Sequence, residues 1–206
     1  MRIKVSHVQV AECRSNPRDW VRKKKAGGGV ILPGYSTGVK NAVFKFHKTG
    51  SDPKARASLA TFLENNARRL TNTDRRAGAV EDLDDYVAWA RTAGVNTPDC
   101  RVILDHPFSP FVSLGGIVSR VDLVEGHLRA VLLGDYPPDW KSDLRYPLIQ
   151  RAIADCYGHP AESVEVGCQR LDGSDLARVC YDVGSLAEAK REFTALADQI
   201  GQIWNE

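Results

Sequence analysis

Apolar and polar residues along the second half of the chain follow the patterns of extended strands. Residues 114–124 and 127–136 are rich in branched apolar side chains, and a tight turn with a glycine joins them. Residues 163–171 alternate as a strand with one exposed face does, and residues 176–183 can pair with them through a second turn. The second half of the chain therefore predicts strands in two neighbouring pairs.

Other segments repeat their apolar residues every three or four positions, which is the period of an amphipathic helix. This period predicts helices over 53–70, 81–93 and 143–157, and a last helix that begins at Ser185, its predicted N-cap. The piece AVFKFH, residues 42–47, alternates and predicts a further strand. The predicted order is helices, a hairpin, a helix, two strands and a helix.

This order predicts the α/β class, with a mixed central sheet flanked by helices. Because 206 residues suit one domain with a sizeable core, we expect a single domain over residues 1–206. Within it, residues 53–93 are a predicted helical insertion and residues 21–30 a predicted basic, glycine-rich loop. The predicted core contains Val118, Val121, Leu123, Val131, Leu133, Leu148, Val164, Val166 and Phe193.

Composition and charge narrow the function only slightly. The net charge of +2 is too small to indicate nucleic-acid binding by itself. The basic run of Lys23, Lys24 and Lys25 is a candidate for phosphate contacts, although such runs are more often solvated surface segments. No stretch approaches the ~20 apolar residues of a membrane span, and the first residues lack the apolar segment of a signal peptide. Five cysteines without a C-x-x-C pair are typical of reduced thiols, so we expect a cytoplasmic protein.

Two aspartates near the ends of predicted strands are the clearest candidates for chemistry. Asp122 lies late in the apolar strand 114–124, where a carboxylate is costly to bury unless it is paired or binds a cation. Asp135 ends the next strand, and a hairpin can bring both carboxylates to the same end of a sheet. Two convergent carboxylates suit Mg²⁺ or Mn²⁺, which generates hydroxide from water and stabilises phosphoryl transfer. The pair therefore predicts a metal site.

The order of these segments resembles the RecB-like branch of the PD-(D/E)XK nuclease superfamily. GGIVSRVDLVEG is similar to that family's first metal-binding strand, with Asp122 as the ligand, and LRAVLLGDY to its "D-x-K" strand, with Asp135 at the acidic position. DLRYPLIQRAIADCYG resembles the following helix, and VSHVQVAECRSNPRDWV resembles the family's opening. The resemblance implies a restriction-endonuclease-like fold. It also implies a Mg²⁺-dependent DNA nuclease that works with a protein partner in a repair, recombination or phage-defence complex.

The chain departs from the family pattern at the lysine that orients the attacking water. Pro137 stands at that position, and proline cannot orient a water. Lys141 is the nearest amine along the chain and is the candidate catalytic replacement. Arg145, at the family's glutamine position, is the candidate for gripping a phosphate. His106 is a further candidate metal ligand, although it lies outside the matching helical context, and the cysteines of the family's iron–sulphur members are missing, so no cluster is expected.

Each aspartate also has a purely structural interpretation. Asp122 can pair with Arg120 or Arg145, and Asp135 can be a turn residue before the prolines that follow it. Three functions therefore stay open. The chain is an active Mg²⁺-dependent DNA nuclease, a catalytically inactive nuclease fold that binds DNA or scaffolds a complex, or an interaction protein unrelated to nucleases.

Overall fold

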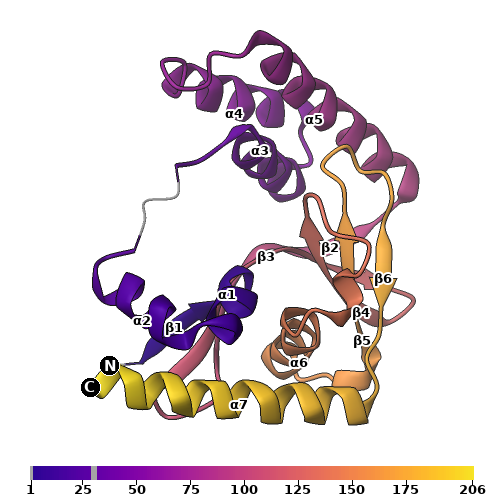
Figure 1. Cartoon of the computed structure of the whole chain (residues 1–206). Coiled ribbons are helices and arrows are strands. Elements are labelled where there is room, and N and C mark those ends of the chain that lie inside the picture. The colour runs from indigo at the N-terminus through magenta and orange to yellow at the C-terminus, as the bar shows by residue number, and fades with distance from the viewer. Residues whose placement is uncertain (1, 29–31) are drawn as a thin grey trace.

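The computed structural model describes residues 2–28 and 32–206 and contains a mixed six-stranded sheet with helices packed against it (Figure 1). The strands are β1 (Ile3–Ser6), β2 (Asn96–Pro107), β3 (Val112–Val124), β4 (His127–Leu133), β5 (Val164–Gln169) and β6 (Ala177–Val179). β3 pairs in parallel with β1 and antiparallel with β2 and β4, while β4 pairs in parallel with β5 and β5 antiparallel with β6. The predicted fold class, a mixed central sheet flanked by helices, is confirmed.

β3 shares one of its edges between two other strands. β2 pairs along almost the whole of the opposite edge. On the shared edge, β1 reaches only as far as Gly115, and the pairing with β4 begins at Arg120. β1 runs parallel to β3 and β4 runs antiparallel to it, so the carboxyl ends of β1 and β4 face each other across residues 116–119. We call these residues the gap, and such a break at strand carboxyl ends is where α/β sheets open a crevice.

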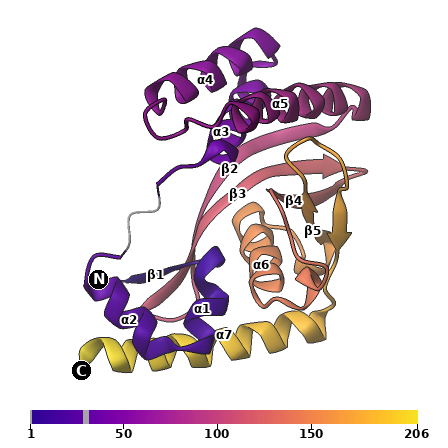
Figure 2. The ribbon, with the colours of Figure 1, turned by 45° about the horizontal axis from the view of Figure 1, so that its top comes forward.

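The helices fall into two groups, each with its own core. The first group lies against the sheet and consists of α1 (Val10–Ser15), α2 (Pro17–Lys25), α6 (Arg145–Tyr157) and α7 (Val183–Asn205). The second group, which we call the helical lobe, consists of α3 (Tyr35–Thr49), α4 (Asp52–Asn65) and α5 (Thr73–Ala93). Short 3-10 helices are η1 (His7–Gln9), η2 (Trp140–Ser142) and η3 (Ala161–Ser163). Figures 1 and 2 show the lobe at one end of the long strands β2 and β3, away from α7.

The predicted core is largely confirmed. Eight of its members are buried, namely Val118, Val121, Val131, Leu133, Leu148, Val164, Val166 and Phe193. Leu123 is the exception, with 39% of its surface exposed. Since successive side chains of a strand point to opposite faces, Leu123 points away from the face on which its neighbour Asp122 is buried.

Residues 42–47 are helical, so the strand predicted for them is wrong. In α3, Val39, Ala42, Val43 and Phe46 share one buried face and pack in the lobe's core. Apolar and polar residues alternate over 42–47 because this helix carries apolar residues on two faces. Over only six residues, this alternation looks the same as that of a strand.

The basic segment is also helical where a loop was predicted. The predicted loop, 21–30, is wrong for residues 21–25, which form the end of α2. Asn16 caps this helix, its side-chain oxygen accepting a hydrogen bond of 3.0 Å from the backbone of Asp19. Two glycines with positive φ follow the helix, and residues 29–31 lie outside the described residues.

Two further boundaries differ from the predictions. α7 begins earlier than expected because Asp182 is its N-cap, accepting a hydrogen bond of 2.7 Å from the backbone of Ser185. The strand predicted over 176–183 is short, since only Ala177–Val179 pair with β5. β2 was not predicted at all, because Pro98 and several charged residues interrupt its alternation.

Candidate functional site

A cleft of about 670 Å³ opens at the gap in β3. The ends of β1 and β4 line it together with the gap itself, and α3 and the start of α6 supply the remaining walls. Its volume is in the range of pockets that hold small ligands or parts of larger ones. The cleft is therefore the candidate functional site.

Side chains replace strand pairing along the gap. The Nε2 of His7 donates a hydrogen bond of 3.1 Å to the backbone oxygen of Ile117, and the Ser119 hydroxyl accepts one of 3.0 Å from the backbone of Leu133. Burial lowers the pKa of His7, so its ring is neutral at pH 7. A side chain on Gly116 would collide with this ring, so the backbone there has to be glycine. Side chains thus bridge the gap where strand pairing is missing, from η1 to Ile117 and from Ser119 to the end of β4.

Lys40 brings an ammonium group to the floor of the cleft. It projects from α3, and its Nζ lies 3.2 Å from the position that a Cβ on Gly134 would occupy. Burial lowers its pKa, and the nearby Asp135 carboxylate acts in the opposite direction. Within residues 2–28 and 32–206, no carboxylate lies within ion-pair distance of this ammonium. A desolvated cation without a partner is costly, so it favours an anionic ligand.

Two arginines add positive charge to the cleft. Arg145 begins α6; its guanidinium lies 4.5 Å from the ring centre of Tyr146, and its Nε lies 3.1 Å from the Asp143 carboxylate. Arg101 reaches the cleft from the middle of β2, where its φ of 58° is left-handed and therefore strained for a residue with a Cβ. Lys40, Arg101 and Arg145 thus line the cleft together with one carboxylate, Asp135.

The two predicted metal ligands are not brought together. Asp122 lies opposite Arg129 in the β3–β4 register, and Asp135 follows Arg129 by six residues along the chain. At about 3.3 Å per residue, six residues of extended chain span about 20 Å, so Asp122 and Asp135 occupy positions far apart along the sheet. The expected convergence of Asp122 and Asp135 is therefore wrong, and only Asp135 lines the cleft.

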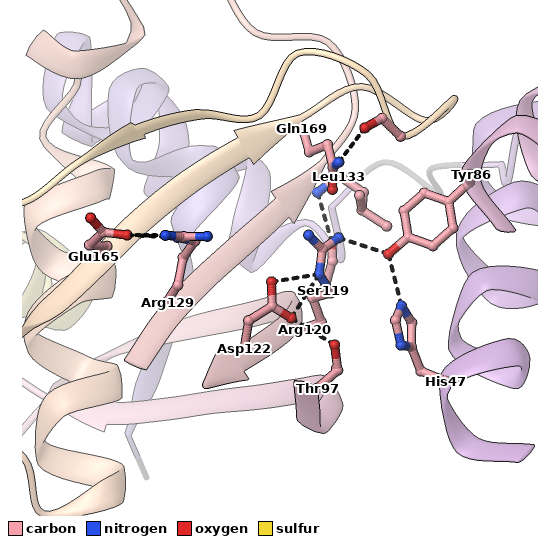
Figure 3. A network of polar contacts seen from close by, with 11 residues as sticks. His47, Tyr86, Thr97, Ser119, Arg120, Asp122, Arg129, Leu133, Glu165 and Gln169 are labelled. Carbon is pink, nitrogen blue, oxygen red and sulfur yellow. Dashed lines mark hydrogen bonds and ion pairs between the residues drawn. The ribbon is translucent and has the colours of Figure 1, made fainter. Parts of the chain in front are cut away.

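Asp122 belongs instead to a buried polar network that joins the sheet to the helical lobe (Figure 3). Its carboxylate oxygens each lie 2.9 Å from the Nε of Arg120, and Thr97 donates a hydrogen bond of 2.7 Å to one of them. Arg120 also donates to the Tyr86 hydroxyl at 2.8 Å, and that oxygen lies 2.8 Å from the Nε2 of His47. Arg120 and Asp122 are both fully buried. The structural interpretation of Asp122, a pair with Arg120, is the one that the geometry supports.

Acid is expected to weaken the fold through His47. Burial, and then the charge of Arg120, lower the pKa of His47 from 6.5 to about 4. The unfolded chain therefore takes up a proton near pH 6.5 that the folded protein does not take up until about pH 4, and stability is lost as the pH falls through that window. We expect the urea midpoint of the wild-type protein to fall between pH 6.5 and about pH 4. The urea midpoint of a His47→Gln variant should fall less over the same range. His7 and His106, whose pKa values are also lowered by burial, contribute in the same direction. An identical pH dependence in the variant would contradict the assignment.

The other predicted residues lie outside the cleft, apart from Arg145. Lys141 is exposed, with its ammonium 5.9 Å from the ring centre of Trp140. His106 lies 3.4 Å from Asp155. The three lysines at the end of α2 interact with other surface side chains. Lys23 forms ion pairs with Glu12 and Asp19. Lys24 lies over the ring of Trp20, and Lys25 lies over the ring of Trp204.

Sequence reasoning missed Lys40, Arg101 and His7. A helix over Tyr35–Thr49 places Lys40 beside the buried apolar face, but the strand predicted for residues 42–47 concealed this helix. Arg101 carries no signal, since a left-handed residue in mid-strand is not readable from its type. His7 owes its place to pairing between residues far apart in the chain.

A magnesium ion does not fit the predicted position. The Asp122 carboxylate is fully engaged by Arg120 and Thr97, and it does not share a site with Asp135, which lies near the Lys40 ammonium. Across the part of the chain that the structure describes, no group of three or more His, Cys, Asp or Glu side chains can hold a metal ion.

Among the described helices, none has the length and apolar character needed to cross a membrane.

No protein-family model matches the chain, and no curated protein does. Among solved structures, the crystal structure of a "Putative exonuclease" from Eubacterium rectale is similar, with a TM-score of 0.56 and 13% sequence identity. The match covers 89% of this chain and 72% of the other. At this identity the likeness concerns the fold, so the chain shares its architecture with a protein described as a nuclease.

Proposed function

We propose that this chain is a nucleic-acid-binding protein built on a nuclease fold, which holds the phosphate backbone of DNA in its cationic cleft and does not itself cleave it. The observation that carries the proposal is the unpaired, desolvated ammonium of Lys40, flanked by Arg101 and Arg145. Cations in a partly dry cleft bind phosphate more strongly than the same cations in water.

The architecture supports the same class of ligand. The likeness to a protein described as an exonuclease, at 13% identity, makes DNA the natural ligand class for a cleft at the carboxyl ends of the strands. Of the functions that the RecB-like resemblance leaves open, the catalytically inactive subunit is the one that the cleft favours, because its polar side chains are mainly cations and hydroxyls. A protein partner that supplies the chemistry completes this proposal.

The test measures binding and cleavage separately. Fluorescence anisotropy of labelled DNA in EDTA should give saturable binding that weakens steeply with salt. The same DNA should stay intact in Mg²⁺ and in Mn²⁺. If the protein does not bind DNA at low salt, the proposal is wrong. If the protein cleaves DNA, and variants of Asp122 and Asp135 do not, the active-nuclease hypothesis holds instead.

A glycine at position 101 should separate stability from binding. Arg101→Gly removes one cation from the cleft, so we expect the affinity for DNA to fall severalfold. It also removes a Cβ from a residue with a φ of 58°, so the free energy of unfolding should rise by about 1 kcal/mol. Urea unfolding and anisotropy measure the two effects, and a variant that is less stable yet binds normally would contradict both parts.

A further inference from the structure

One face of α3 combines the Lys40 ammonium with an aromatic ring. Lys40 and Phe44 are four residues apart on the helix, which makes their side chains neighbours with Cβ atoms about 5–6 Å apart. Both line the cleft, and Phe44 is half-buried there. A cationic group and an aromatic face thus stand next to each other in one cavity.

The gap in β3 supplies a second apolar wall. Ile117 lies on the stretch that neither β1 nor β4 pairs with, and 41% of its surface is exposed. It lines the cleft together with Leu132 and Leu171. An exposed isoleucine and an aromatic side chain that line the same cavity favour a ligand with a flat apolar part, in addition to the anionic part that Lys40 favours.

A nucleotide joins these two properties in one unit. We propose that the cleft holds one unstacked nucleotide of a single-stranded nucleic acid, with its phosphate at Lys40 and Arg145 and its base between Phe44 and Ile117. This inference rests on the proposed function and adds the strand state of the ligand to it.

The need for a free base face distinguishes a single strand from a duplex. Paired bases are stacked, and a duplex presents only their edges in its grooves. A base reaches an aromatic side chain inside a cavity only when it leaves the stack, which costs a duplex several kcal/mol and a single strand far less. Every base has such a face, so we expect little sequence preference.

The experiment compares Phe44 variants on four probes. These are a labelled oligothymidylate, the same strand annealed to oligoadenylate, and thymidine 5′-monophosphate and inorganic phosphate as competitors. Phe44→Ala should weaken binding of the single strand about tenfold and leave duplex binding and phosphate competition unchanged. Phe44→Leu, which keeps the apolar volume, should show a similar loss. The matched control is Phe111→Ala, since Phe111 is 56% exposed and lies outside the cleft.

The outcomes separate this inference from the function on which it rests. Equal losses on single strand and duplex, or no loss in either Phe44 variant, overturn the inference and leave DNA binding intact. Thymidine monophosphate that binds as tightly as the oligonucleotide overturns it in favour of a free nucleotide. A wild-type protein that binds neither form of DNA fails the proposed function itself. Thermal unfolding of each variant distinguishes a loss of binding from a loss of fold.

Discussion

Replacement of Asp122 by alanine is expected to lower the free energy of unfolding by about 3–5 kcal/mol, because it leaves a buried arginine without its counter-ion. Arg120 is fully buried, so no solvent hydrates its charge. Its Nη2 already lacks a hydrogen-bond partner among the described residues. Thr97 loses its acceptor at the same time. Urea unfolding followed by tryptophan fluorescence measures the loss.

Two further variants make this expectation specific. Asp135→Ala removes an exposed carboxylate and should change stability by no more than about 0.5 kcal/mol. The double variant Arg120→Met, Asp122→Leu removes both buried charges and should recover most of the lost stability. If Asp122→Ala instead unfolds like the wild type and abolishes a Mg²⁺-dependent cleavage, Asp122 is a metal ligand after all and the network is incidental.

Replacement of Lys40 by glutamate is expected to weaken DNA binding about a hundredfold. A charge-assisted hydrogen bond contributes about 1.5–3 kcal/mol, each 1.4 kcal/mol corresponds to a factor of ten, and the new carboxylate would also repel the phosphate. Lys45→Glu is the matched control, since it makes the same charge change on the same helix at an exposed position outside the cleft. Equal losses in the two variants would mean that net charge, and not the cleft, governs binding.

Lys40→Met adds a test of the opposite sign. Burial lowers the pKa of Lys40, which means that the fold disfavours its charged form. Methionine keeps the length of the side chain without the charge, so this variant should be more stable than the wild type while it binds DNA less well. As the pH rises toward 10.5, the folded wild-type protein loses the proton of Lys40 before the unfolded chain does. The wild type should therefore gain stability relative to the Met variant over this range.

The strands around the predicted hairpin were predictable because their buried residues alternate or run continuously. β3, β4 and β5 all lie within a few residues of the predicted segments. The helical lobe was only partly predicted, because the apolar positions of α3 also read as a strand over six residues. β2 was not predictable from its pattern, since it contains a proline and owes its pairing to β3.

The candidate site was half predicted, and the missing half has a physical reason. Asp135 and Arg145 do line the cleft. Asp122 was assigned to the same place, yet a tight two-residue turn at Glu125 and Gly126 already fixes the register and sets Asp122 opposite Arg129. The sequence therefore contained the evidence against convergence. Lys40 was not predicted because its helix was not recognised, and the gap between β1 and β4 depends on pairing between residues far apart in the chain.

The shared edge of β3 imposes an order on the assembly of the cleft during synthesis. Ile3 of β1 pairs with Val112, so β1 leaves the ribosome long before its partner β3 follows. At about 5–20 residues per second, this wait lasts several seconds. During that time β1 presents an unpaired strand to every other chain nearby. The cleft is complete only when β1 and β4 both occupy the shared edge of β3, so the binding site cannot form before β4 has been synthesised.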